Sequence, residues 1–166
     1  MIIRDATHDD LPAILAIFNE VIKTSTAVYR DDPVPLEERR AWFEARKQGG
    51  YPVLAAEAKG KVIGFSSFGE FRGAYPGYRH TVEHSVHVDN HARGTGAGTA
   101  LLEALFPLAA AMGKHVMIGA IDAANAGSLR FHARLGFAQT GLLPEVGFKF
   151  GRWLDLAFVQ KTILGC

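Results

Sequence analysis

The 166-residue sequence has almost no cysteine, almost no net charge and no long apolar run. Its one cysteine, Cys166, is the last residue, which excludes a disulfide framework and a cysteine-based metal cluster and argues against a thiol nucleophile. The 18 basic and 17 acidic residues give a net charge of +1, so no overall field favours nucleic acid or an anionic membrane. No stretch approaches the roughly 18 apolar residues of a membrane span, and the sequence lacks the pattern of a signal peptide. These absences predict a cytoplasmic protein in which any anion-binding site is local.

The composition is that of a folded domain. With 48% hydrophobic and 21% charged residues, the chain matches globular proteins rather than disordered or repeat proteins. The sequence has no internal repeat and no linker long enough to divide it. We therefore expect residues 1–166 to form a single domain with its own core.

Helical and strand patterns alternate along the chain. Apolar residues recur at helical spacing after the capping segment of Thr7, Asp9 and Asp10, and again over residues 36–47. Residues 51–58 and 61–68 read as an antiparallel hairpin. Further strands are predicted at residues 2–4, 81–88, 115–121 and 148–162, and further helices at residues 98–112 and 125–135. This order predicts an α/β (α+β) fold in which helices cover a single mixed sheet.

The strongest functional signal is a glycine-rich turn between a predicted strand and a long apolar helix, Arg93-Gly94-Thr95-Gly96-Ala97-Gly98-Thr99. Glycines at alternate positions let backbone N–H groups turn toward an anion, and the start of the helix adds the positive end of its dipole. Arg93 adds a fixed positive charge at the mouth of the turn. The segment therefore predicts a pyrophosphate-binding loop.

Two other kinds of phosphate loop fit this segment less well. A P-loop requires Gly-Lys-Ser/Thr at its end, and the segment has no lysine. A Rossmann site would lack its third small glycine at Thr99, although Asp122 after the next strand suits a ribose partner. The hairpin and two helices that precede the loop also argue against a Rossmann fold. A glycine-rich turn with a purely structural role stays open as an alternative for the loop in isolation.

The loop from Arg93 to Gly98 resembles the coenzyme A loop of the GNAT superfamily of acetyltransferases, Arg/Gln-x-x-Gly-x-Gly/Ala, at every fixed position. Residues 125–137 resemble the second coenzyme motif of that superfamily. More narrowly, residues 81–86 and 149–155 resemble those of phosphinothricin and methionine sulfoximine or sulfone acetyltransferases, and the similarity spans nearly the whole chain. The resemblance implies a GNAT-type fold with a mostly antiparallel central sheet. It also implies direct transfer from acetyl-CoA to the α-amine of a small amino-acid-like substrate.

Acetyl transfer to an amine requires a neutral nitrogen, a polarised thioester carbonyl and a route for the released proton. Glu83 lies on the strand that leads to the phosphate loop, and the phosphinothricin group has a glutamate at the matching position that is proposed as the base, acting directly or through water. The alternative is an ordinary solvated glutamate of a strand. In many GNAT enzymes a tyrosine on the last helix protonates the departing thiolate, and His132 occupies the matching position. His132 is either that acid or a packing residue.

The coenzyme site implied by the resemblance uses main-chain and side-chain groups. The backbone of Val86, His87 and Val88 is expected to pair with the pantetheine arm, with one amide as an oxyanion donor. The phosphate loop Arg93-Gly94-Thr95-Gly96-Ala97-Gly98-Thr99 holds the pyrophosphate. Asn125 and Ser128 match positions that bind the pantetheine and pyrophosphate region, and Arg134 can meet a phosphate.

An amino-acid acceptor with a tetrahedral sulfur or phosphorus requires cationic and hydrogen-bonding groups for its polar ends. The candidates for this substrate site are Arg72, Arg79, Glu83, His84, Ser85 and Lys149. Arg72 follows the central hairpin, so its guanidinium can reach over a cleft beside Glu83. The alternative for Arg72 is an ordinary exposed arginine.

Four histidines, His80, His84, His87 and His91, recur at spacings of four, three and four. On a helix this spacing would form a metal-binding stripe. The valines between them favour a strand instead, in which His80 and His84 face one way and His87 and His91 the other. We therefore expect no metal site here.

The expected partner is a small amino-acid-like molecule, with no nucleic acid and no membrane. The resemblance suggests a homodimer with acceptor sites near the subunit boundary. Two alternatives stay open from the sequence: an acetyltransferase for peptide N-termini or other amines, and a non-catalytic acyl-CoA-binding module.

Overall fold

The computed structural model describes residues 1–163, so Cys166 lies outside the described residues. The chain forms seven strands, β1 (Ile2–Asp5), β2 (Val53–Ala58), β3 (Lys61–Glu70), β4 (Thr81–Val88), β5 (Val116–Asp122), β6 (Ala138–Lys149) and β7 (Arg152–Thr162). Its four α-helices are α1 (Leu11–Thr24), α2 (Leu36–Gln48), α3 (Ala97–Ala111) and α4 (Ala126–Arg134). No helix within the described part of the chain has the length and apolar character that a bilayer crossing requires.

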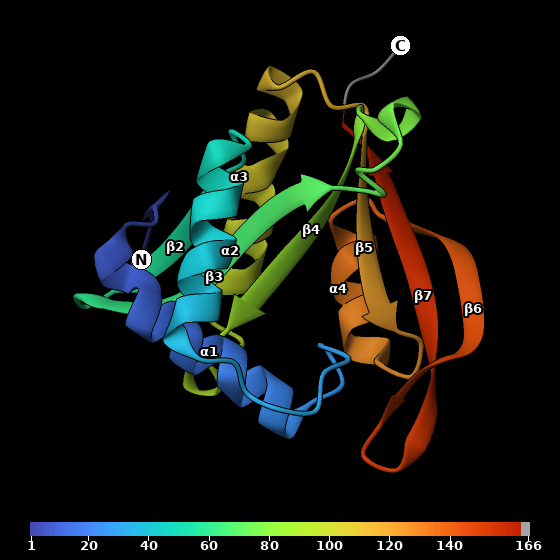
Figure 1. Cartoon of the computed structure of the whole chain (residues 1–166), viewed down its shortest axis with the longest axis horizontal. Coiled ribbons are helices and arrows are strands. Elements are labelled where there is room, and N and C mark those ends of the chain that lie inside the picture. Colours follow the sequence, from blue (N-terminus) through green and yellow to red (C-terminus); the bar gives the residue numbers. More distant parts are fainter. Residues whose placement is uncertain (164–166) are drawn as a thin grey trace.

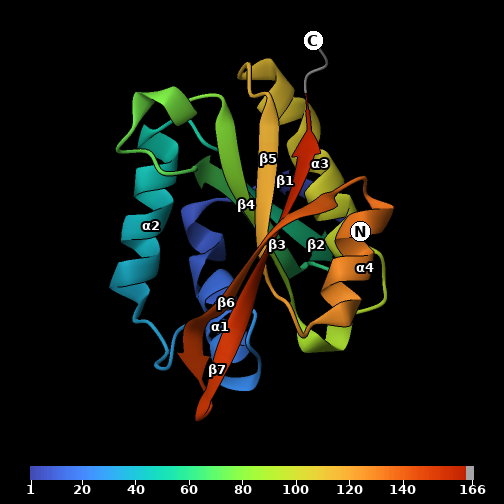
Figure 2. The ribbon, with the colours of Figure 1, turned by 90° about the vertical axis from the view of Figure 1, so that its right-hand side faces the viewer.

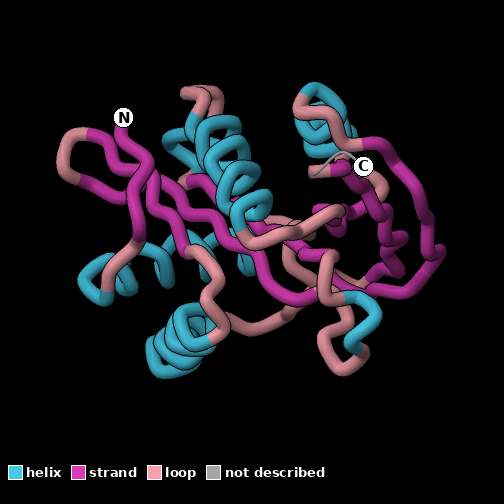
Figure 3. Tube along the Cα trace, turned by 90° about the horizontal axis from the view of Figure 1, so that it is seen from above, coloured by secondary structure: helices cyan, strands magenta, loops and turns pink. Residues whose placement is uncertain are grey.

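All seven strands belong to one sheet with the order β1-β2-β3-β4-β5-β7-β6. Every neighbouring pair is antiparallel except β4 and β5, which are parallel. Figure 3 shows helices on both sides of the strand layer. The predicted mixed, mostly antiparallel sheet flanked by helices is confirmed.

The two parallel strands separate soon after they meet. β4 pairs with β5 only from Thr81 opposite Val116 to Glu83 opposite Ile118, whereas its pairing with β3 continues to Val88. Figure 1 shows β4 and β5 diverging toward their carboxyl ends. Over residues 84–88 the main-chain groups of β4 that face β5 therefore have no strand partner, and backbone polar groups require partners. The divergence opens a gap in the middle of the sheet.

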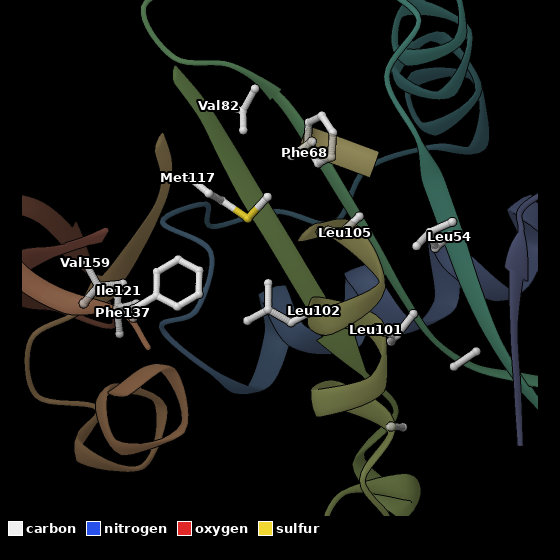
Figure 4. Close-up of a cluster of buried hydrophobic side chains, with 13 residues drawn as sticks. Leu54, Phe68, Val82, Leu101, Leu102, Leu105, Met117, Ile121, Phe137 and Val159 are labelled. Carbon is white, nitrogen blue, oxygen red and sulfur yellow. The ribbon is translucent and has the colours of Figure 1, made fainter. Parts of the chain in front are cut away.

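Each face of the sheet has its own apolar core. Alternate residues of β2 point to opposite faces: Val53 and Ala55 pack with α1 and α2, and Leu54 and Ala56 pack with α3. The α3 side is the larger cluster and is shown in Figure 4. In Figure 2 the helices α1 and α2 lie on one side of β4, and α3 and α4 on the other. These packed layers fix the positions of the strand ends around the gap.

One strand differs from the sequence prediction. Strand character was expected over residues 148–162, but β6 already begins at Ala138, and a turn at Phe150 and Gly151 separates it from β7. β6 is an edge strand whose side chains are almost all exposed, and its register shifts twice against β7. An exposed edge strand has no period-two apolar pattern, so the expected start of the terminal strand region at residue 148 was wrong.

Candidate active site

The glycine-rich segment forms a turn that leads into the N-terminus of α3. Gly94 and Gly96 have φ angles of 77° and 86°, in the left-handed region that side-chain-bearing residues avoid. Gly96 is the N-cap of α3 and no side chain caps this helix, so its first amides keep their hydrogen atoms for another acceptor. The Thr95 hydroxyl donates to the Ala92 carbonyl at 2.6 Å and braces the turn. Free amides at a helix N-terminus suit an anion such as a pyrophosphate.

A cavity of about 1060 Å³ begins at this turn and passes through the gap between β4 and β5. On one face of the sheet it is lined by Phe18 of α1 and by Arg39 and Trp42 of α2; on the other it is lined by Gly98 of α3 and Phe131 of α4. Fifteen of the residues predicted for the site line it: Glu83, His84, Ser85, Val86, His87, Val88, Arg93, Gly94, Gly96, Gly98, Thr99, Asn125, Ser128, His132 and Arg134. Thr95 and the buried Ala97 belong to the same turn without lining the cavity.

Glu83 lies at the point where the strands begin to separate. It is the last residue of β4 that is paired with β5, and its half-buried side chain lines the cavity. Burial raises the pKa of its carboxyl above the ordinary value, and the nearby charge of Arg46 opposes this shift. No lysine, arginine or histidine within residues 1–163 forms a salt bridge with it. A desolvated carboxylate without an ion partner is suited to accept a proton.

The histidines of β4 lie on its two faces. His87 shares the face of Glu83 and packs edge-on against Phe18 and near Phe65, and burial lowers its pKa to about 4. His84 lies on the other face, where its ring stacks on His132 of α4. Burial lowers the pKa of His84 to about 3 and also lowers that of His132. All three rings are therefore neutral at neutral pH.

The start of α4 borders the same cavity. The Asn125 side chain accepts a hydrogen bond of 3.0 Å from the Ser128 amide and caps the helix. Ser128 also meets His132, whose Nδ1 lies 2.8 Å from the Ser128 carbonyl oxygen. Arg134 is exposed at the end of the helix and lines the cavity.

Three of the residues predicted to bind the acceptor do not line the cavity. Arg72 and Arg79 are exposed in the loop between β3 and β4. The Arg72 guanidinium lies over the rings of Tyr75 and Tyr78 and donates to the Tyr78 hydroxyl at 3.3 Å. Arg79 donates to the Pro76 carbonyl at 3.1 Å. The structure therefore gives these two arginines local partners within their own loop.

Lys149 is the third predicted acceptor-binding residue that does not line the cavity. It is 1% exposed and contacts the last part of α1 and the segment that follows it. Its ammonium donates to the carbonyl oxygens of Ile22, Ser25 and Val28 at 2.6, 2.8 and 2.8 Å, which satisfies all three of its hydrogen atoms. Val28 lines the cavity. The lysine thus ties the β6–β7 hairpin to one wall of the cavity.

We expect Lys149→Met to lower the free energy of unfolding by about 2–4 kcal/mol, because three carbonyl oxygens around a buried site lose a charged donor. Urea denaturation monitored by circular dichroism would measure the loss. Lys61→Met is the matched control, since Lys61 is exposed at the start of β3 and should change stability little. Equal stability of the two variants would contradict the bracing role of Lys149.

Arg39 lines the cavity, and the sequence reasoning missed it. It is 6% exposed, its guanidinium lies 3.8 Å from the centroid of the Phe18 ring and 4.3 Å from that of Trp42, and its buried Nε has no hydrogen-bond partner. Burial lowers its pKa to about 10. A buried arginine without an anion among residues 1–163 leaves a positive charge at the cavity wall. The one signal in the sequence was its place on the same face of α2 as the apolar Trp42 and Phe43.

The histidine stripe does not form. His80 and His91 are exposed at either side of β4, and His84 and His87 lie on opposite faces of the strand. Within the described residues no three histidine, cysteine, aspartate or glutamate side chains gather as a metal site would require.

Comparison with known proteins gives consistent matches. Residues 14–137 match the Acetyltransferase (GNAT) family. The chain is 52% identical to an L-methionine sulfoximine/L-methionine sulfone acetyltransferase of Pseudomonas paraeruginosa over 97% of this chain and 94% of that one. It is 37% identical to a phosphinothricin N-acetyltransferase of Alcaligenes faecalis over 97% of this chain and 82% of that one.

Among solved structures, that of yncA from Salmonella typhimurium with its cofactor acetyl-CoA matches with a TM-score of 0.96 and 45% identity, covering 100% of this chain and 95% of that one. The sequence match and the structural match extend over the turn before α3, the divergent strands and α4. The chain therefore belongs to the GNAT family and is an acetyltransferase.

Proposed function

We propose that the protein transfers the acetyl group of acetyl-CoA to the α-amine of a small amino-acid-like substrate such as methionine sulfoximine, methionine sulfone or phosphinothricin. One observation carries the proposal: a single cavity joins the anion-binding turn before α3 to the buried carboxyl of Glu83. The names of relatives that match nearly the whole chain support this class of acceptor.

The turn before α3 suits the pyrophosphate of acetyl-CoA, and the gap between β4 and β5 suits its pantetheine arm. The uncapped amides at the start of α3, with Arg93 beside them, suit the pyrophosphate. The unpaired main-chain edge of β4 over residues 84–88 suits the amide groups of the pantetheine arm, and one of its N–H groups would stabilise the thioester oxyanion. The acetyl group would then lie close to Glu83.

Glu83 is the proposed general base. The amine of an amino acid is an ammonium at neutral pH and must lose a proton before it can attack. The raised pKa of Glu83 brings it closer to neutrality and makes it a better proton acceptor than an exposed glutamate. It acts directly or through a water molecule. His132, across the gap from it, is proposed to deliver a proton to the departing thiolate.

The positive wall of the cavity suits an acceptor that carries negative charge. Arg39 supplies a buried guanidinium on the same face as Glu83. A carboxylate or a phosphinate is the natural partner of such a group, since a bidentate arginine contact offsets the cost of its burial. This favours amino-acid acceptors over polyamines.

Release of free thiol from acetyl-CoA tests the proposal. The acceptor panel comprises methionine sulfoximine, methionine sulfone, phosphinothricin, a polyamine and a short peptide with a free N-terminus. We expect saturable release with at least one of the three amino-acid analogues, and N-acetylation confirmed by mass spectrometry. Binding of acetyl-CoA without thiol release for any of the amino-acid analogues would overturn the proposal. Thiol release with the peptide alone would show that the acceptor is a peptide N-terminus and not a free amino acid.

We propose also that the protein is a homodimer that buries the exposed apolar side chains of the β6–β7 hairpin. Six large apolar side chains are exposed on this hairpin: Leu142, Leu143, Val146, Phe148, Phe150 and Trp153. β6 is an edge strand that pairs only with β7 among the described residues, and apolar edges of this kind promote association with another chain. The hairpin contacts the cavity wall through Lys149, so a second copy packed against the hairpin would lie beside the acceptor site.

Trp153→Lys should shift the protein from dimer to monomer at micromolar concentration, with a rise in the dissociation constant of more than about tenfold, because a charged group would replace the exposed aromatic side chain that packs against Phe148. Size-exclusion chromatography with light scattering measures the change. Tyr75→Lys is the control, since Tyr75 is 58% exposed against 63% for Trp153 but lies in the loop before β4. A monomeric wild-type protein would refute the dimer.

A further inference from the structure

Two buried imidazoles meet where β4 and β5 separate. His84 is the first residue of β4 beyond its last pair with β5, and His132 lies on α4. Their Nε2 atoms are 3.2 Å apart, and the two near-parallel rings, with an interplanar angle of 22°, meet at their edges. His84 is 9% exposed and His132 is 4% exposed. A contact between two ring nitrogens is a hydrogen bond only if one carries a proton and the other does not.

The surroundings determine which nitrogen carries the proton. The Nδ1 of His132 lies 2.8 Å from the carbonyl oxygen of Ser128, and a carbonyl can only accept, so this Nδ1 must carry a hydrogen atom. A neutral imidazole has one N–H, which leaves the Nε2 of His132 bare. The hydrogen atom between the two rings therefore belongs to the Nε2 of His84. The Nδ1 of His84 is then a bare nitrogen, and it is buried without a partner among the described residues.

A glycine on β5 makes room for this contact. A Cβ atom on Gly119 would lie 2.7 Å from the Nε2 of His84 and 3.5 Å from the Nε2 of His132. The first distance is shorter than real Cβ contacts allow, so any larger residue at this position would displace the His84 ring. The need for a residue without a side chain at position 119 is thus explained by the space that the two histidine rings occupy and not by the backbone angles of the glycine.

We propose that His84 is a positioning residue for His132, that its Nε2–H holds the orientation of the His132 ring from the side opposite the Ser128 carbonyl, and that Gly119 provides the space in which the two rings meet. The inference rests on the proposed function in one respect: it takes His132 to be part of the acetyl-transfer site. The tautomers themselves follow from the contacts and not from the reaction.

Nitrogen NMR of histidine-labelled protein without ligands tests the tautomers directly. We expect the wild type to show His132 protonated at Nδ1 and His84 protonated at Nε2. In His84→Phe, which keeps an aromatic ring against Phe137, His132 should keep its Nδ1–H, but its Nε2 resonance should move to the shift of a ring nitrogen without a hydrogen bond. His84→Gln, whose amide can still donate to the Nε2 of His132, should restore the wild-type Nε2 shift.

Turnover gives the second readout. His84→Phe should lower kcat by about tenfold or more and leave the KM for acetyl-CoA unchanged, and His84→Gln should recover much of the loss. Gly119→Ala keeps both imidazoles but displaces the His84 ring, so it should reproduce the shifted Nε2 resonance of His132 and the lower kcat, and it serves if His84→Phe folds poorly. Wild-type His132 protonated at Nε2, or His84→Phe with normal kcat, would overturn the inference. If no amino acid is acetylated while the tautomers are as expected, the proposed function fails and the pairing stands.

Discussion

Glu83→Gln should lower kcat by about 10²- to 10⁴-fold, the range expected when a general base is removed. The acetyl-CoA dissociation constant should stay within about twofold of wild type, because the glutamine keeps the shape of the side chain and the groups proposed to bind the coenzyme lie on α3, α4 and the free edge of β4. An assay of thiol release measures kcat, and calorimetric titration measures the acetyl-CoA dissociation constant. Glu103→Gln, an exposed glutamate on α3, is the matched control and should behave as wild type.

The pH dependence of the wild type gives a second check on the same carboxyl. The base must be ionised to act, so kcat/KM should rise as the pH increases through its pKa. Burial raises the pKa of Glu83, so this rise should lie above the range of an exposed glutamate. The rise should disappear in Glu83→Gln, leaving only the titration of the acceptor amine. A Glu83→Gln enzyme with wild-type kcat across the pH range would exclude this residue as the base.

The double variant Gly94→Ala/Gly96→Ala should raise the acetyl-CoA dissociation constant by about 10²-fold. Both glycines have positive φ angles, and an L-residue there costs about 1–2 kcal/mol at each position. The turn would relax to other angles, and its N–H groups would no longer converge with those of α3. Isothermal titration with acetyl-CoA measures the loss.

The control for this variant replaces two other glycines with positive φ angles, so that the cost of backbone strain is the same but lies outside the turn. Gly60 and Gly113 have φ angles of 73° and 70°, and a Cβ on either meets nothing within 4 Å, as is true of Gly94 and Gly96. Gly60→Ala/Gly113→Ala should therefore lose a similar amount of stability without any change in coenzyme affinity. Equal affinities in the two double variants would show that the turn before α3 does not hold the coenzyme.

The turn before α3 and the cap of α4, where the coenzyme is proposed to bind, could be predicted from the sequence because their signals are local. The turn at residues 93–99 follows from glycines at fixed spacing before an apolar helix, and the cap of α4 follows from Asn125. Both depend on neighbours within a few residues. The element order was sufficient to predict a mixed sheet, since each helix and most strands carry a clear periodicity.

The acceptor side could not be predicted in the same way because its geometry depends on contacts that are distant in sequence. Lys149 contacts Ile22, Ser25 and Val28, more than 120 residues away, and nothing local marks it as a buried brace. The contact between His84 and His132 spans 48 residues. Arg39 reads as one of several charged residues on an amphipathic helix, and only the packed structure reveals its burial.

The divergence of β4 and β5 separates two evolutionary tasks. The thioester donor is expected to be recognised by main-chain groups and by the start of α3, which tolerate many side-chain changes. The acceptor is expected to meet side chains from α1, α2 and the segment between them. Substitutions in that second set can alter the range of amines that are modified while the donor chemistry stays intact, so descendants of such a chain can acquire new acceptors without having to rebuild the machinery that activates the acyl group.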